Sequence, residues 1–244
     1  MTSPRNPIIA PLDVPDLDAA RARLERLDEA VERFKIGKQL FTAAGPDAVA
    51  LARSYGKRVF LDLKYHDIPN TVGEAVRSAA SIGAWMVNIH VGGGRAMLEA
   101  AAKAVEEFGD DRPLLIGVTV LTSLDDPLWR EVYGDGALPV REQVLRMATL
   151  AQECGLDGVV ASPQEVRPIR ERCGPDFLLV TPGVRPGWAA SDDQKRTMTP
   201  GDAIRAGADY LVIGRPIARA SDPLDAARRV LAEIDAARAE REPA

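Results

Sequence analysis

Residues 60–72 read FLDLKYHDIPNTV, a stretch that begins like a buried strand and ends in charged side chains. Its apolar residues are those of a parallel strand that is covered on both faces. Asp62 and Lys64 are two residues apart, so on a strand their side chains point to the same face. Asp67 follows where the strand gives way to a loop, and a helical pattern runs over 70–82. This strand with its helix is the unit from which we predict the fold.

The same alternation of an apolar run and a helical pattern recurs along the whole chain. The runs expected to form strands are 8–14, 34–37, 58–64, 85–91, 113–121, 157–162, 177–183 and 210–216. The helix-like stretches are 16–32, 46–55, 70–82, 94–108, 139–154, 163–173, 201–207 and 222–240. Eight alternations in 244 residues, without a linker, predict an α/β protein, a single-domain (β/α)8 TIM barrel over residues 1–244. A doubly wound open sheet remains the alternative, because alternation alone does not show closure.

Composition excludes several classes of protein. The net charge of −5 argues against broad nucleic-acid binding, although a local cluster of donors can still bind a small anion. No apolar run approaches the roughly 18 residues of a membrane span, and the N-terminus has no signal-peptide pattern. Cys154 and Cys173 stand in unrelated contexts, which indicates neither a disulfide framework nor a metal-binding pair. We expect a cytoplasmic protein that binds neither membranes nor nucleic acid.

Charged residues gather at one end of the first three predicted strands. Asp13, Lys35, Asp62 and Lys64 come near the carboxyl ends of these strands, and Asp67 lies just beyond. A salt-bridge network that closes the barrel mouth is the plainer interpretation. However, a buried ion pair is weak evidence for stability, and inward positions of a barrel are normally apolar. The cluster therefore favours a functional site at the face where such barrels build their active sites.

A metal site is the other use of these side chains. His66, His90, Asp62 and Asp67 are ligand types that a divalent metal accepts. These are the only two histidines, each has an ordinary role in holding a loop or strand end, and Lys64 would add a positive charge beside the ion. We therefore predict no metal.

A second group of residues indicates phosphate binding. The last predicted strand ends in IGRP, where Gly214 permits close backbone approach and Arg215 can bind phosphate through two hydrogen bonds. Barrels often hold phosphate in the loops after strands seven and eight. The long polar segment 184–200 carries Arg185 and Gln194, and we expect it to act as a lid over an anion.

Two stretches do not fit the simplest barrel unit. Pro11 lies inside the first apolar run, where it removes a backbone donor from the ladder, so we expect a strand start or a local irregularity. Residues 122–138, after the fifth run, are more numerous than a connection needs.

Several segments together resemble the orotidine 5′-monophosphate decarboxylase family, in order and in spacing. They are LDVP, FKIGKQLF, DLKYHDIPNT, WMVNIHVGGG, GVTVLTS, CGLDGVV, TPGVRP and MTPGDAIRAGADYLVIGRPI, and they cover almost the whole chain. The bare D-x-K-x-x-D pattern also occurs in the magnesium-dependent 3-keto-L-gulonate 6-phosphate decarboxylase and hexulose 6-phosphate synthase. The continuation IPNT and the TPGVRP segment separate this chain from those enzymes. Pro11 departs from the family, which usually has a small residue there.

The resemblance implies decarboxylation of orotidine 5′-monophosphate to UMP, the last step of de novo UMP synthesis, in a homodimer without cofactor or metal. By position, Lys64 resembles the catalytic lysine, and Lys35, Asp62 and Asp67 complete an alternating tetrad in which Asp67 comes from the other subunit. The implied substrate contacts are Asp13 (ribose), Thr122 (pyrimidine), Thr71 (nucleotide lining), and Arg185, Gln194, Gly214 and Arg215 (phosphate), with Lys35 and Asp62 beside the substrate. The rival interpretations are a magnesium-dependent sugar-phosphate decarboxylase or aldolase, and a catalytically silent nucleotide-binding protein on the same fold.

Overall fold

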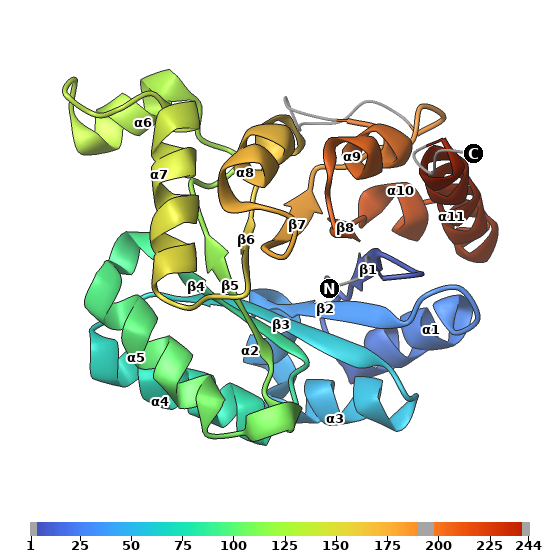
Figure 1. Ribbon diagram of the computed structural model, residues 1–244. Helices are drawn as coiled ribbons and strands as arrows, with labels where there is room; N and C mark the ends of the chain where they lie inside the picture. The colour runs from blue at the N-terminus through green and yellow to red at the C-terminus, as the bar shows by residue number, and fades with distance from the viewer. Residues whose placement is uncertain (1–3, 190–197, 241–244) are drawn as a thin grey trace.

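Eight parallel strands close into a barrel in sequence order (Figure 1). The structure is a computed structural model that describes residues 4–189 and 198–240. The strands are β1 (Ile8–Pro11), β2 (Arg33–Gly37), β3 (Arg58–Tyr65), β4 (Met86–His90), β5 (Leu114–Val118), β6 (Gly158–Val160), β7 (Leu178–Pro182) and β8 (Tyr210–Val212). β1 pairs with β8 through Ile8↔Leu211 and Ile9↔Val212. The predicted TIM barrel is confirmed, and the open-sheet alternative is wrong because the first and last strands are hydrogen-bonded neighbours.

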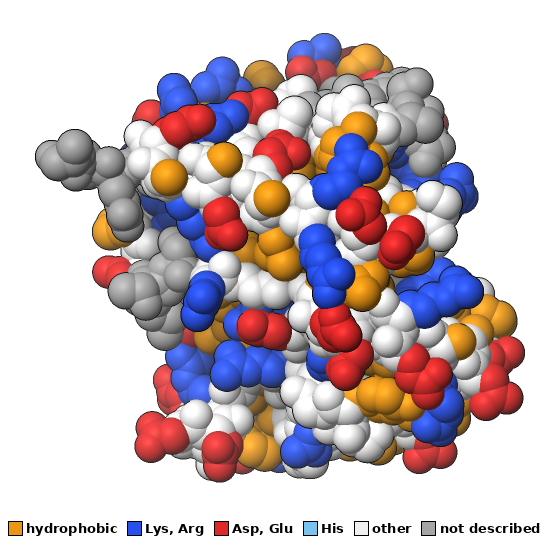
Figure 2. All heavy atoms as spheres, turned by 90° about the vertical axis from the view of Figure 1, so that its right-hand side faces the viewer, with side chains coloured by type: hydrophobic (Ala, Val, Ile, Leu, Met, Phe, Trp, Pro, Cys, Tyr) orange, Lys and Arg blue, Asp and Glu red, His pale blue; other side chains and the backbone are white. Residues whose placement is uncertain are grey.

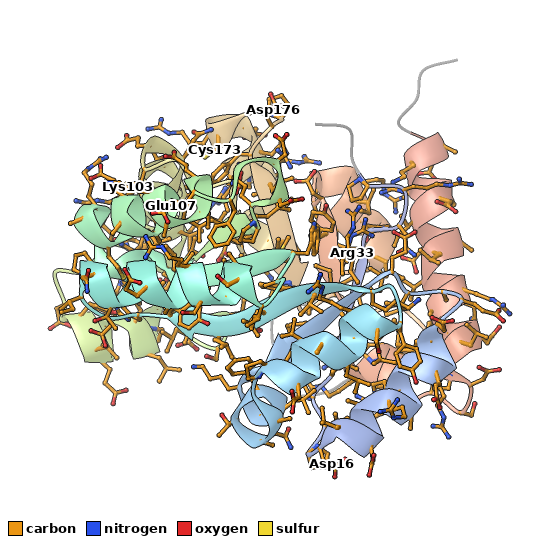
Figure 3. All side chains as sticks on the ribbon, turned by 90° about the horizontal axis from the view of Figure 1, so that it is seen from below. Asp16, Arg33, Lys103, Glu107, Cys173 and Asp176 are labelled. Carbon is orange, nitrogen blue, oxygen red and sulfur yellow. The ribbon has the colours of Figure 1, made fainter. Side chains whose placement is uncertain are left out.

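Helices cover the outside of the barrel (Figure 1). The α-helices are α1 (Leu17–Leu27), α2 (Lys38–Ala44), α3 (Pro46–Ser54), α4 (Pro69–Ser81), α5 (Arg95–Glu106), α6 (Asp126–Tyr133), α7 (Val140–Glu153), α8 (Val166–Cys173), α9 (Pro200–Ala206), α10 (Arg215–Ala218) and α11 (Pro223–Ala239). Three short 3-10 helices are η1 (Val91–Gly93), η2 (Gly109–Asp111) and η3 (Pro163–Glu165). Side-chain caps fix several starts; for example, Asp16, labelled in Figure 3, accepts a hydrogen bond from the Ala19 nitrogen at the start of α1.

Three of the α-helices lie where the sequence predicted no helix. α2 follows β2 directly, α10 follows β8, and α6 occupies the long segment 122–138. Asp125 caps α6 by accepting from the Leu128 nitrogen, and Trp129 is buried in the hydrophobic core. The segment is therefore a folded part of the molecule and more than an extended connection.

Pro11 is the last residue of β1. The Leu12 nitrogen donates to the Lys35 carbonyl on the β2 side, so the residue-11 nitrogen faces β8. The β1–β8 pairing has already ended there at Ile9↔Val212, so the missing donor interrupts no pairing between these two strands. The expectation of a strand start was wrong, since the residue ends the strand.

The barrel interior changes from apolar to polar toward the carboxyl ends of the strands. Its middle is filled by Ile9, Phe60, Met86, Ile116, Leu178, Val180 and Tyr210. At the opposite end Arg33, labelled in Figure 3, lies over the rings of Trp85 and Tyr210, 5.3 and 5.6 Å from their centroids. Two residues beyond Phe60 and Met86 the chain carries Asp62 on β3 and Asn88 on β4, and the register partner of Phe60 on β2 is Lys35. The fold thus places polar groups at one end of a packed interior.

Charges of both signs are interspersed on the face shown in Figure 2, without a single cationic field. Among residues 4–189 and 198–240, no helix combines the length and the apolar character that crossing a membrane requires.

Candidate active site

Four predicted site residues form a chain of alternating charge at the carboxyl ends of β1–β3. Lys35 Nζ lies 3.2 Å from Asp13 Oδ1 and 3.2 Å from Asp62 Oδ2. The other oxygen of Asp62, Oδ1, accepts a hydrogen bond from Lys64 Nζ. We call Asp13–Lys35–Asp62–Lys64 the charged chain. Its members meet because the parallel strands that carry them are neighbours in the barrel.

Asp62 is the buried centre of the charged chain, with 8% of its surface exposed. Burial raises the pKa of its carboxyl group, but the charges of Lys35 and Lys64 and the hydrogen bonds that it accepts outweigh burial, so the net pKa lies below the ordinary value. The carboxylate is therefore charged at neutral pH and presents an anion to both ammonium groups.

Lys64 has an unusual backbone. Its φ is 54°, the one positive φ of a non-glycine residue in the described part of the chain. This left-handed conformation costs roughly 1–2 kcal/mol for an L-residue and persists where the surroundings hold it. The β3–β4 pairing also shifts register between Leu61 and Tyr65. Asp62 and Lys64 do meet as predicted, but across a local irregularity rather than through regular strand alternation.

Asn88 is hydrogen-bonded to both Lys64 and Asp62, and it was not among the residues predicted from the sequence. Its Oδ1 accepts from the Lys64 backbone nitrogen at 2.8 Å, and its Nδ2 donates to Asp62 Oδ1 at 2.7 Å. The residue has no exposed surface. The available signal was an amide inside the apolar run 85–91, on the strand next to the charged one.

Gly37 leaves room for the Lys35 ammonium group. A Cβ at this position would lie 3.0 Å from Lys35 Nζ and 3.4 Å from Asp13 Oδ1. Because φ is −94°, the backbone itself accepts other residues, and the constraint comes from the charged chain alone.

A pocket of about 550 Å³ opens beside the charged chain, at the ends of β1, β2, β7 and β8. Among its lining residues are the predicted Asp13, Lys35, Arg185, Gly214 and Arg215, together with two arginines that the sequence reasoning missed, Arg23 and Arg219. Four guanidinium groups around one small pocket fit a multiply charged anion.

Arg185 is positioned by a short bridge at the base of its loop. Val184 pairs with Met198, and the Arg185 nitrogen donates to the Met198 carbonyl at 2.9 Å. Gly214 caps α10, and a Cβ there would lie 3.2 Å from Pro11 Cγ. Pro11 and Gly214 thus pack where the first and last strands close the barrel.

The remaining predicted residues lie outside this pocket or outside the described residues. Asp67 is exposed, and its Oδ1 accepts from the Ile68 nitrogen at 2.7 Å. Thr71 is exposed in the first turn of α4, and Thr122 is exposed in the turn after β5. Gln194, and with it residues 190–197 of the expected lid, lies outside the described residues.

The two histidines lie side by side at the same end of the barrel. The ring centroids of His66 and His90 are 5.3 Å apart. Partial burial, followed by the charges of His66, Lys64 and Lys38, lowers the pKa of His90 to about 4. Within residues 4–189 and 198–240, no three His, Cys, Asp or Glu side chains are grouped so that they could hold a metal ion.

The lowered pKa of His90 predicts acid sensitivity. In the unfolded chain the ring takes up a proton near pH 6.5, whereas in the folded chain it does so near pH 4, so stability falls as the pH falls between these values. In His90→Gln the free energy of unfolding should fall by about 1–2 kcal/mol less over this pH range than in the wild type. This figure is reduced for the solvent screening of a partly exposed ring. Urea unfolding at pH 7, 5.5 and 4.5 measures it, and an equally steep loss in the variant contradicts the assignment. Protonation of Asp62 does not affect this measurement, because the stability that its carboxylate contributes is lost only below the ordinary pKa of 3.8.

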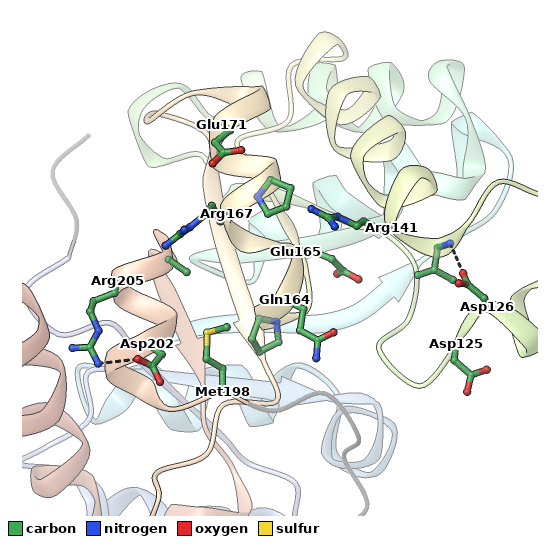
Figure 4. A pocket seen from close by; sticks show the side chains of 14 residues that line it. Asp125, Asp126, Arg141, Gln164, Glu165, Arg167, Glu171, Met198, Asp202 and Arg205 are labelled. Atoms are coloured by element: carbon green, nitrogen blue, oxygen red, sulfur yellow. Dashed lines mark hydrogen bonds and ion pairs between the residues drawn. The ribbon is translucent and has the colours of Figure 1, made fainter.

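A larger cavity of about 890 Å³ lies away from the charged chain, among α6, α7, α8 and α9 (Figure 4). Some of its charged groups are engaged within the fold: Arg205 pairs with Asp202 at 2.8 Å, and Asp126 accepts from the Val140 nitrogen at 2.7 Å. The smaller pocket, which adjoins the charged chain, is therefore the candidate active site.

Comparison with known proteins gives one consistent result. The model of the orotidine 5'-phosphate decarboxylase / HUMPS family matches residues 6–230. An orotidine 5'-phosphate decarboxylase of Pelobacter propionicus is 56% identical over 231 residues, which are 94% of this chain and 95% of that protein. The corresponding protein of Moorella thermoacetica is 54% identical and covers 95% of this chain and 93% of its own length. A crystal structure of orotidine 5'-phosphate decarboxylase from Lactobacillus acidophilus superposes with a TM-score of 0.84 at 37% identity, covering 94% of this chain and 99% of that one.

Proposed function

The chain belongs to the orotidine 5'-phosphate decarboxylase / HUMPS family, and we propose that it removes the C6 carboxylate of orotidine 5′-monophosphate to give UMP and CO2 without a metal. The observation that carries the proposal is the charged chain, which ends in a lysine held by a buried carboxylate beside an arginine-lined pocket. The product would enter pyrimidine nucleotide synthesis, as in the relatives named for the same activity, and we place the reaction in the cytoplasm.

The difficult step is the formation of charge at C6. When the C6–carboxylate bond breaks, the electron pair stays on C6 in the plane of the ring and cannot delocalise into the π-system. The Lys64 ammonium group would stabilise this pair and then transfer a proton from Nζ to C6, and the resulting amine would regain a proton from solvent. Enzymes lower barriers by roughly 8–23 kcal/mol, and this reaction would lie toward the upper end.

The rest of the charged chain would orient Lys64 and the substrate. Asp62 holds the Lys64 ammonium group and, in this proposal, lies near the departing carboxylate. Lys35 and Asp13 continue the chain toward the ribose, because Asp13 also lines the pocket. We assign Thr122 to the pyrimidine and Thr71 to the nucleotide lining from the family resemblance.

The phosphate would bind in the pocket at the ends of β7 and β8. Arg185 and Arg215 line it, and Gly214 allows close approach of the backbone. The phosphate is remote from the bond that breaks, so its binding energy can hold the substrate in the reactive position. Gln194 belongs to this proposal through the family resemblance alone.

We further propose a homodimer in which Asp67 of one subunit completes the active site of the other. Within one chain Asp67 is exposed and bonds to the neighbouring backbone, while Ile68 beside it is 66% exposed. An exposed isoleucine next to an exposed carboxylate suits a surface that a second copy covers.

Mixing inactive subunits tests this shared site. Asp67→Ala and Lys64→Ala chains, each inactive alone, should together regain about one quarter of wild-type activity per chain, because half the dimers are mixed and each mixed dimer has one intact site. Refolding the two chains together and assaying turnover measures this. A verified mixed dimer that stays inactive contradicts the shared site.

The proposed reaction is tested by ultraviolet absorbance during incubation with orotidine 5′-monophosphate, with and without EDTA. Loss of the orotate chromophore that persists in EDTA supports the proposal. Turnover that EDTA abolishes would instead favour a magnesium-dependent decarboxylase. No turnover by folded protein would favour the sugar-phosphate enzymes or a binding role.

A further inference from the structure

The only left-handed non-glycine residue in the described part of the chain is also the proposed proton donor, and one side chain fixes its backbone. The irregular β3–β4 pairing leaves the Lys64 nitrogen opposite Asn88, whose Oδ1 accepts from it at 2.8 Å. Asn88 has no exposed surface, so water does not compete for this hydrogen bond.

The same amide also fixes the carboxylate that holds the lysine side chain. Asn88 Nδ2 donates to Asp62 Oδ1 at 2.7 Å, and this oxygen accepts from Lys64 Nζ as well. Lys64 is therefore held at both ends by one residue: at its backbone directly, and at its ammonium group through Asp62.

The chemistry of the two contacts requires an amide. A backbone nitrogen needs an acceptor, and a carboxylate needs a donor, which also sets the orientation of the amide group. Leucine would satisfy neither partner, and an aspartate would place a second carboxylate against Asp62. Asparagine supplies one donor and one acceptor at the required length.

From this arrangement we infer that Asn88 is a positioning residue that sets the place of the Lys64 ammonium group for proton transfer. The inference rests on the proposed function, since it concerns the same reaction. Asn88 itself does not contact the reacting atoms: it acts through Asp62 and the Lys64 backbone. Its removal should therefore reduce the rate of the chemical step and leave the phosphate end of the site intact.

Steady-state kinetics and UMP binding of Asn88→Ala test the inference. We expect kcat to fall by about 10–100-fold, as for misplacement of a reacting group by about 1 Å, while KM and the Kd of UMP change less than about threefold. Ile89→Val is the matched control, because Ile89 is equally buried on β4 but takes no part in the charged chain. It should unfold slightly more easily and keep its kcat.

Asn88→Asp supplies a second test that preserves the shape of the side chain. When protonated, the introduced carboxyl group offers one donor and one acceptor, like the amide; when ionised, it repels Asp62. The ratio of variant to wild-type kcat should therefore rise as the pH falls. A purely structural role would not produce this pH profile.

The outcomes separate this inference from the proposed function. An active wild type with Asn88→Ala within threefold of its kcat overturns the inference, as does a parallel loss of kcat and UMP affinity. A flat ratio for an impaired Asn88→Asp also overturns it. A folded wild type that does not turn over orotidine 5′-monophosphate overturns the proposed function instead.

Discussion

Lys64→Ala is expected to lower kcat for orotidine 5′-monophosphate by at least about 10⁴-fold while UMP still binds. The estimate combines loss of charge stabilisation, worth about 10²–10³-fold, with loss of a general acid, worth about 10²–10⁴-fold. UMP should still bind because the arginine-lined pocket proposed for phosphate lies at β1, β2, β7 and β8, whereas Lys64 is on β3. Single-turnover kinetics and UMP titration measure the two effects separately.

Two controls make this experiment specific. Lys57→Ala removes an ion-paired lysine just before β3, where Nζ lies 2.7 Å from Asp28 Oδ1, and should leave kcat unchanged. Lys64→Gly suits the positive φ of 54° and should be at least as stable as Lys64→Ala, yet equally inactive. Near-normal turnover by either Lys64 variant would remove the central residue from the proposed mechanism.

Arg215→Ala should lower kcat/KM by roughly 10²–10³-fold, mainly through weaker binding of the nucleotide. A bidentate hydrogen bond from guanidinium to phosphate is charge-assisted, and alanine provides neither the charge nor the two donors. The phosphate group also provides binding energy that holds the base at the charged chain, so kcat should fall by a smaller factor.

Comparing ligands with and without phosphate isolates the role of Arg215. Wild-type protein should bind UMP far more tightly than uridine, and Arg215→Ala should reduce this difference without changing the affinity for uridine. Arg228→Ala is the control, since Arg228 pairs with Glu29 on the surface and should leave both affinities unchanged. Equal loss of uridine affinity would indicate a general disturbance of the pocket.

The sequence predicted the strands better than their ends. Each apolar run overlaps a strand, but buried residues continue beyond the strand ends. Leu12 and Val14 are buried after β1 ends, and Ile213 is buried between β8 and α10. An apolar residue in a covered loop looks like one in a strand, so the boundaries could not be read from hydrophobicity. Closure of the barrel could not be predicted from the sequence either, because it depends on pairing between β1 and β8, which are distant in sequence.

The charged chain was predictable, but the groups that hold it were not. Charged residues at the ends of neighbouring parallel strands must meet, and Asp13, Lys35, Asp62 and Lys64 do. The left-handed backbone of Lys64 and its contact with Asn88 depend on a register shift that no spacing of residues reveals. Arg23 reaches the arginine-lined pocket from α1 and Arg219 reaches it from the turn after α10, and an arginine in such places is ordinarily a surface residue.

The closure of β8 onto β1 has a consequence for the newborn polypeptide. The first four strands carry the charged chain and Asn88, whereas Arg185 and Arg215 belong to the last quarter of the sequence. A ribosome would therefore complete the charged chain long before it supplies the two arginines proposed to bind phosphate. Chains released early would lack half of the binding site, so catalytic competence would arrive only with full-length translation and the final strand pairing.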